Sequence, residues 1–197
     1  MVRRERRGRK NLFVPVFIIT IMVLSVFGVM IGGLTQEDNN AIEYNGINFI
    51  LKQGGYFFTT NGGAYSTLSS PLEVEGFSNV LSDEFWNDFK SGVYNKVYLD
   101  VSNPSAGVAL NELHTNLNGK LNMGLSCSNG YEDAEQCLQL PIKSCGEPGI
   151  LIITMNVQEE KESSYENGCV TVKGSLGYLT GVADNFVMNY AGVYDGN

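Results

Sequence analysis

The sequence predicts an N-terminal transmembrane helix followed by one domain of α+β or α/β class with a mixed sheet. Three observations predict this fold class. Residues 12–34 form an uncharged apolar run of 23 residues, which is long enough to cross a bilayer as a helix. Strand-like and helix-like segments alternate in the rest of the chain and include a β-α-β series. The last segment repeats apolar residues at helical spacing, so we expect a C-terminal helix packed on the sheet.

The charge of the chain changes sharply at the apolar run. Residues 1–10 hold six of the 13 basic residues and one acid, whereas the other 187 residues hold 7 lysines and 20 acids, a net charge of −13. Basic residues beside a span are retained on the cytoplasmic side. We therefore expect a basic cytoplasmic head at residues 1–11, a linker at 35–41 and an extracytoplasmic domain at 42–193. A short basic tail beside a span is typical of a topology signal and not of nucleic-acid binding.

The apolar run from Leu12 to Leu34 is expected to contact membrane lipid as an uncleaved signal-anchor. A cleaved signal peptide is the alternative, but its apolar core has about 7–15 residues. A pilin-like subunit with a leader processed near Gly8 is a further alternative, although basic residues follow that position instead of an apolar stretch. Gly28 and Gly32 form a Gly-x-x-x-Gly pair, through which two copies could form a homodimer.

Strand signals open the predicted domain. Residues 48–52 and 56–60 flank Gly54-Gly55, a pattern that predicts a β-hairpin, and a third strand is expected at 64–68.

Two short helices should follow these strands. Ser70 begins a capping box with proline at the first helical position, and Ser82 caps a second helix. The apolar face of the second helix holds the only tryptophan, Trp86, which we interpret as a core residue.

A strand at 96–101, a helix that opens at Asn103-Pro104 and an apolar run at 121–125 form the β-α-β series, so we expect two parallel strands. The most apolar strand, at 149–155, is expected at the centre of the sheet.

The end of the chain completes the predicted domain. Residues 159–162 form a solvated turn or edge, Asn167-Gly168 turns the chain into a strand at 169–173, and Ser175 caps the last helix.

The cysteines all lie in the part of the chain that we place outside the membrane, at Cys127, Cys137, Cys145 and Cys169. An even number in an oxidising compartment favours two disulfides. Of the three possible pairings we prefer Cys127–Cys137 and Cys145–Cys169, because the second would join the approaches to two neighbouring parallel strands. Zinc is the alternative, but the intervals of 10, 8 and 24 residues differ from the short spacing of structural zinc sites.

Asp100 and Ser102 are the candidate site residues. They follow a buried strand and precede a helix, where ligands bind in open α/β sheets. The pattern resembles part of the Asp-x-Ser-x-Ser metal-adhesion motif of von Willebrand factor A domains, which implies magnesium and a partner carboxylate. Pro104 occupies the position of the last serine, and the same residue types are common helix caps. We therefore keep Asp100 and Ser102 as metal-ligand candidates and expect neither a metal nor a cofactor.

Other chemistry finds little support in the sequence. The only histidine, His114, lies mid-helix beside the apolar face without a nucleophile motif, so we interpret it as a boundary residue. The pairs Glu132/Asp133 and Glu159/Glu160 lie in polar loops, and we find no glycine-rich phosphate loop.

Several stretches resemble uncharacterised single-pass membrane-anchored proteins of small-genome archaea. They are the basic head, the apolar run, Tyr44-Asn45-Gly46, Leu140-Pro141-Ile142-Lys143-Ser144-Cys145 and Asn167-Gly168-Cys169-Val170. The resemblance spans most of the chain. It implies an anchored outer domain with paired cysteines and implies no activity, so it assigns no functional residue.

Two further hypotheses of function stand beside the pilin-like subunit. The first is a non-enzymatic, membrane-anchored extracytoplasmic domain that binds an unknown envelope protein or takes part in envelope assembly. The second is an envelope enzyme with a site near Asp100 and Ser102.

Overall fold

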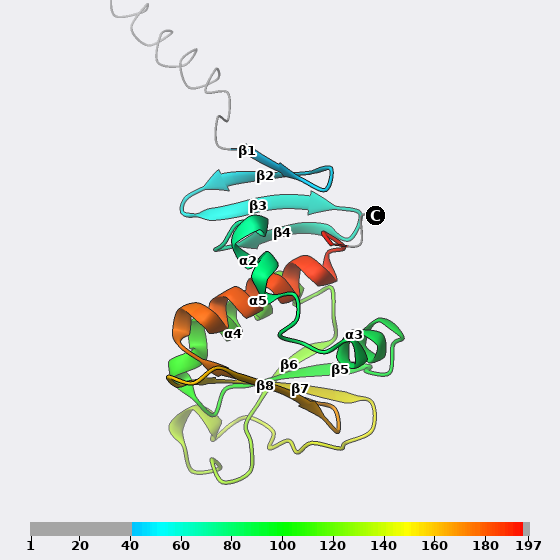
Figure 1. The fold of residues 1–197 in the computed structure, drawn as a ribbon. Helices are drawn as coiled ribbons and strands as arrows, with labels where there is room; N and C mark the ends of the chain where they lie inside the picture. The colour runs from blue at the N-terminus through cyan, green and yellow to red at the C-terminus, as the bar shows by residue number, and fades with distance from the viewer. Residues whose placement is uncertain (1–40, 195–197) are drawn as a thin grey trace, which may run out of the picture. The chain divides into compact units, whose positions relative to one another are not determined.

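The computed structural model describes residues 41–194, which form two sheets with helices between them (Figure 1). The head, the predicted span, its Gly-x-x-x-Gly pair and the pilin-type leader lie outside the described residues. Within residues 41–194, no helix combines the length and the apolar character that crossing a bilayer requires.

The first sheet is an antiparallel meander in the order β1-β2-β3-β4. Its strands are β1 (Ala41–Tyr44), β2 (Ile47–Lys52), β3 (Gly55–Thr60) and β4 (Gly63–Thr67). The predicted hairpin is confirmed, but its turn is Gln53-Gly54, one residue earlier than expected. Both turn residues have positive φ, as the tight hairpin turn that matches strand twist requires. The sequence did not predict β1, whose first residue was assigned to the linker.

The two predicted short helices are present, and they connect the two sheets. In α2 (Pro71–Val74) the Ser70 hydroxyl and the Glu73 carboxylate complete the capping box. A 3-10 turn, η2 (Glu75–Phe77), follows. In α3 (Asp83–Lys90) the Ser82 hydroxyl accepts the backbone N–H of Phe85, and the chain leaves the helix at Gly92 with positive φ.

The second sheet is mixed and has the order β6-β5-β7-β9-β8. Its strands are β5 (Lys96–Asp100), β6 (Met123–Ser126), β7 (Ile150–Val157), β8 (Glu162–Glu166) and β9 (Cys169–Gly174). All are parallel except β8, which runs antiparallel at the edge. The parallel β-α-β pair and the central position of β7 are confirmed, whereas the strand β8 is an addition to the predicted turn or edge.

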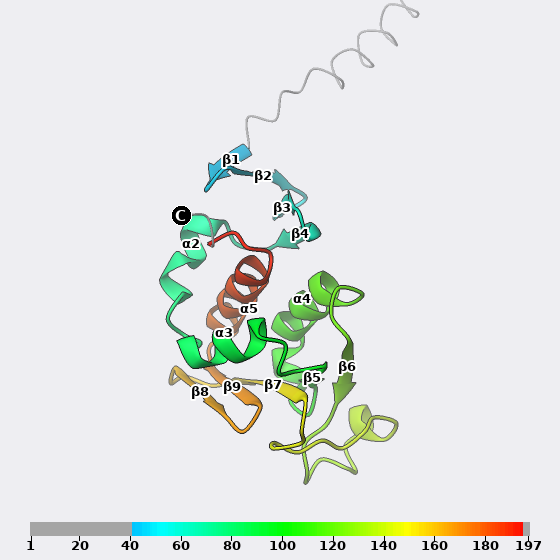
Figure 2. The same ribbon diagram turned by 90° about the vertical axis from the view of Figure 1, so that its right-hand side faces the viewer.

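Two helices lie between the sheets (Figures 1 and 2). They are α4 (Gly107–Leu117), which follows the 3-10 turn η3 (Pro104–Ala106), and the C-terminal α5 (Leu176–Tyr190) capped by Ser175. The predicted mixed sheet and C-terminal helix are confirmed, whereas the second, antiparallel sheet was not predicted. The physical reason for two sheets is that α5 buries several of its faces, including Val182 and Val187, and so needs a sheet on each side.

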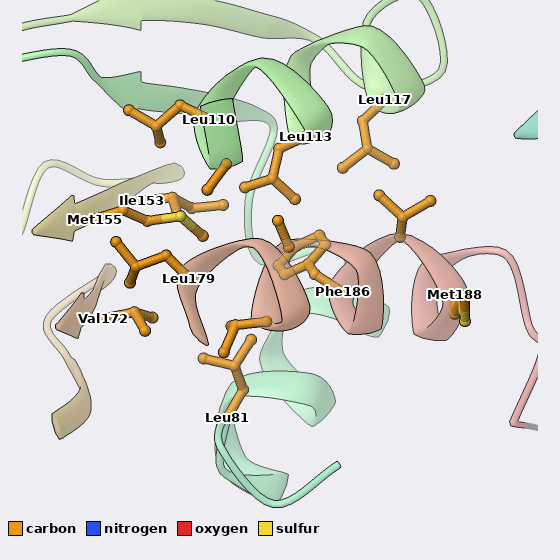
Figure 3. Close-up of a cluster of buried hydrophobic side chains, with 14 of the residues drawn as sticks. Leu81, Leu110, Leu113, Leu117, Ile153, Met155, Val172, Leu179, Phe186 and Met188 are labelled. Atoms are coloured by element: carbon orange, nitrogen blue, oxygen red, sulfur yellow. The ribbon is translucent and has the colours of Figure 1, made fainter. Parts of the chain in front are cut away.

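The hydrophobic core gathers around α5 (Figure 3). Leu151, Ile153 and Met155 of β7 point into this core, because alternate residues of a strand face one side. Ile152 and Thr154 therefore lie on the other face of the sheet.

Polar contacts attach the first sheet to the rest of the domain. The Asn116 side chain on α4 accepts the backbone N–H of Ser66 at 2.7 Å. At the C-terminal end, the Asn45 amide donates to the carbonyl of Val193 at 3.1 Å, and the rings of Tyr44 and Tyr194 meet edge to face at 5.9 Å.

Candidate functional site

The Asp100 cluster lies at the carboxyl end of β5, on the face of the mixed sheet opposite α5. Asp100 is 3% exposed and is flanked in register by Ser126 of β6 and Thr154 of β7. The short connection to η3 places Ser102 beside it. The structure therefore brings the two sequence-predicted site residues together.

Both oxygens of the Asp100 carboxylate accept hydrogen bonds. Oδ1 accepts the backbone N–H of Ser102 at 3.0 Å and its hydroxyl at 2.6 Å. Oδ2 accepts the hydroxyls of Ser128 and Thr154, the latter at 3.1 Å. A carboxylate offers about four lone-pair sites, so these four neutral donors use its accepting capacity.

The cluster also holds the long loop at residues 127–149. The Ser128 backbone donates to the Ser102 hydroxyl at 2.9 Å, and the Gln136 side chain donates to the Ser102 carbonyl at 3.1 Å. Asp100 thus connects two strands, the turn after β5 and this loop, which is a structural arrangement for a buried carboxylate.

The residues present fit a metal site poorly. Asp100 is the only carboxylate of its cluster, and within residues 41–194 no group of three or more His, Cys, Asp and Glu is placed to hold a metal. Pro104 begins η3, and the Asn103 side chain accepts the Ser105 N–H at 3.1 Å as its cap. This part of the pattern therefore serves as a helix start.

Two disulfides fix the loop, and both expected pairings are confirmed. Cys127–Cys137 closes the first part of the loop, with a Cα–Cα distance of 5.8 Å. Cys145–Cys169, with a Cα–Cα distance of 5.4 Å, joins the approach to β7 to the start of β9. Because β7 and β9 run parallel, their starts lie at the same edge of the sheet.

The stapled loop displays apolar side chains beside the edge strand β6. Leu138 is 66% exposed and Leu125 is 38% exposed. With Val101, Leu140 and Glu135 they line a hollow of about 640 Å³, which we call the loop groove. No periodic pattern in the sequence indicated it, because its residues come from a strand, a turn and a loop that contains the short 3-10 turn η4 (Glu135–Cys137).

The other residues that the sequence singled out have structural positions. His114 is half-buried, and its backbone carbonyl accepts the N–H of Asn118 at the end of α4. The Glu132 carboxylate accepts the N–H of Gly130 within its own turn, which lowers the Glu132 pKa. Glu159 and Glu160 are exposed. The half-buried Trp86 packs against Phe186 and therefore belongs in part to the core.

One acidic pair, the buried Asp184 and the half-buried Glu112, escaped the sequence analysis. Burial raises the pKa of Asp184 on α5 to about 6, although the N–H groups of Leu68 and Ser69 oppose the shift. Burial and the nearby Asp184 raise the pKa of Glu112 on α4 to about 7. An acidic residue in a predicted helix is normally expected at the surface, so only the packing of α4 against α5 identifies this pair.

Comparisons with known proteins found no matching family model, curated protein or solved structure.

Proposed function

We propose that this chain is a membrane-anchored extracytoplasmic domain that binds a protein partner at the cell envelope. The apolar run at residues 12–34 and the charge change beside it support the anchor and its orientation. The pairing of all four cysteines supports an oxidising compartment for the domain.

The loop groove is the observation that carries the binding role. Long irregular segments in compact domains are commonly functional, and this one is held by two disulfides and by the Asp100 cluster. Constraining the loop leaves its exposed Leu138 in a defined place, which lowers the entropic cost of binding a partner there.

The chemistry of the groove defines the partner. Its floor is apolar, whereas Glu135 lines it and Glu132 and Asp133 lie in the same loop. A protein segment that inserts an aliphatic or aromatic side chain and places lysine or arginine beside it would complement this surface.

Orientation is tested on intact cells. Externally added protease should remove the epitope of a tag inserted in the exposed turn at residues 158–161, and alkylation without reductant should label no cysteine. Protection of the tag together with four alkylated cysteines would refute the extracytoplasmic placement.

Partner binding is tested by photocrosslinking in native membranes. A photoreactive residue at Leu138 should give a discrete protein adduct, and the same residue at the exposed Lys52 of the first sheet is the matched control. The proposal fails if Leu138 gives no adduct, or the same adducts as the control.

An envelope enzyme with Asp100 and Ser102 at its site is the second candidate. It is favoured by the 2.6 Å bond from the Ser102 hydroxyl to the Asp100 carboxylate, which is the geometry of a hydroxyl beside a base. The full set of donors around Asp100 supports the binding role over this one.

A further inference from the structure

A second cavity lies at the opposite, amino end of β5 and β6, where α3, the α4–β6 connection and the end of α5 meet. It has a volume of about 440 Å³, within the range of small-molecule sites. Half-buried Trp86, Phe89 and Tyr190 form its aromatic walls, and lysine and asparagine side chains, among them Lys90, Lys120 and Asn122, contribute its polar groups. We call it the aromatic pocket.

The walls of the aromatic pocket are held in place by ring contacts. The ring centroid of Trp86 lies 5.2 Å from that of Phe186, and the centroid of Phe89 lies 6.2 Å from that of Tyr190. Flat apolar surfaces are therefore presented to a ligand without rearrangement, which favours a ring that can stack on them.

The charge of the pocket is opposite to that of the domain. Residues 41–194 contain 17 acids and 7 lysines, yet three of these lysines line the pocket and none of these acids does. The Lys96 ammonium lies 4.7 Å from the centroid of the Tyr98 ring and the Lys120 ammonium lies 4.2 Å from that of the Tyr65 ring, and both keep their positive charge beside the pocket. The Lys120 ammonium is fixed by its 2.6 Å bond to the Asn116 carbonyl.

Amides complete the rim of the pocket. The Asn122 side chain donates to the Asn95 carbonyl at 3.1 Å, and the Asn189 side chain donates to the Asn185 amide oxygen at 2.9 Å. These bonds hold both amides in position, and an amide offers donors and acceptors of the kind that sugar hydroxyls need.

We propose that the aromatic pocket binds an acidic saccharide, whose ring stacks on Trp86 and Phe89 while its carboxylate meets Lys90 and Lys120. The inference deepens the proposed envelope role, on which it rests, by adding a glycan ligand at a site distant from the loop groove. The carboxylate of such a ligand would explain the lysines of the pocket, and its hydroxyls would explain the asparagine amides.

The single tryptophan makes the proposal directly measurable, because Trp86 reports on its own pocket. The full-length chain in detergent micelles is titrated with methyl glycosides of glucuronic, galacturonic and mannuronic acid and with their neutral parent hexosides. At least one uronate should change the tryptophan fluorescence saturably, with affinity about tenfold above that of its neutral parent. The absence of a saturable response to all three uronates, or equal affinity for the neutral parents, overturns the proposal.

Charge variants separate ion recognition from folding. Lys90→Gln at the exposed end of α3 should weaken uronate binding about threefold and leave binding of the neutral hexoside unchanged. Lys52→Gln, which removes the same charge from the first sheet, is the matched control and should have no effect. Equal affinity of the Lys90→Gln variant and the unmodified chain would exclude Lys90 from the site. Failure here leaves the membrane-anchored role standing, because protease access and crosslinking at Leu138 test that role separately.

Discussion

The Asp184 carboxylate accepts the backbone N–H of Ser69 at 2.8 Å, across 115 positions of the chain. Its other oxygen accepts the N–H of Leu68 at 3.3 Å. Asp184 is fully buried on α5, and both N–H groups belong to the segment that leaves β4. One carboxylate therefore fixes the exit of the first sheet onto the central helix.

Replacing Asp184 with alanine should lower the free energy of unfolding by about 2–3 kcal/mol, because two part-buried N–H groups lose their buried acceptor. Asp184→Asn retains one acceptor oxygen and should cost less. Equilibrium denaturation measures both variants, with Asp133→Ala in the exposed loop as the control. If the Asp184→Ala variant were as stable as the unmodified chain, water would have replaced the carboxylate as the acceptor.

The acidic pair should make the domain less stable as pH rises. The raised pKa values mean that the folded state binds protons more tightly than the unfolded state, from the ordinary values of 3.8 and 4.5 up to about 6 for Asp184 and about 7 for Glu112. This stabilising contribution is complete below the ordinary values and is lost as pH rises through that window.

Glu112→Gln should therefore stabilise the domain near neutral and alkaline pH but not in acid. The amide keeps an oxygen that can accept from the Asn116 side chain, as the carboxylate does at 3.0 Å. After discounting for the partial exposure of Glu112, we expect a gain of about 1 kcal/mol, or about 2–4 °C in Tm, at about pH 8. Thermal scans at two pH values measure it, and Glu160→Gln in the exposed turn should not reproduce the difference between them. An equal gain at both pH values would contradict the assigned protonation.

Removal of the Asp100 carboxylate should release the loop while leaving the core folded. We expect Asp100→Ala to lower the free energy of unfolding by about 2–3 kcal/mol and to speed hydrogen exchange at Ser128, whose bonds to Asp100 and Ser102 hold the loop. Exchange measured by mass spectrometry should remain slow in α5, which serves as an internal control. Unchanged exchange at Ser128 would show that the disulfides alone fix this segment.

Two glycines of α5 provide a matched test of packing. A Cβ at Gly181 would lie 2.7 Å from the Phe77 ring, whereas a Cβ at Gly177 meets nothing within 4 Å. Gly181→Ala should destabilise the domain by about 1 kcal/mol, because Phe77 must move from its contact with Tyr178. Gly177→Ala should be neutral or stabilising by up to about 0.5–1 kcal/mol through helix propensity. Thermal unfolding compares the two, and equal effects would refute the packing argument.

Local signals explain which elements the sequence predicted. The cap residues Ser70, Ser82 and Ser175 each accept an N–H from the residue three positions later, so each cap can be recognised within a few residues of sequence. The pairing of Cys145 with Cys169 also followed, because the turn at Asn167-Gly168 and two apolar strands indicated which strand starts lie together.

Long-range packing decided the remainder. The division into two sheets depends on the several buried faces of α5, and the partners of Asp184 are more than a hundred residues away. For the candidate site, the contact of Asp100 with Ser102 was predictable from their spacing of two. Ser128 and Thr154 join them only through the strand order β6-β5-β7, which no local pattern encodes.

The contacts of Asn45 with Val193 and of Tyr44 with Tyr194 bring the two ends of the described domain to one corner. The described domain therefore suits circular permutation: a short glycine linker could join residue 194 to residue 41, with new termini placed in the exposed turn at 158–161. A protein fused after residue 194 would therefore begin at the same corner of the domain as Tyr44.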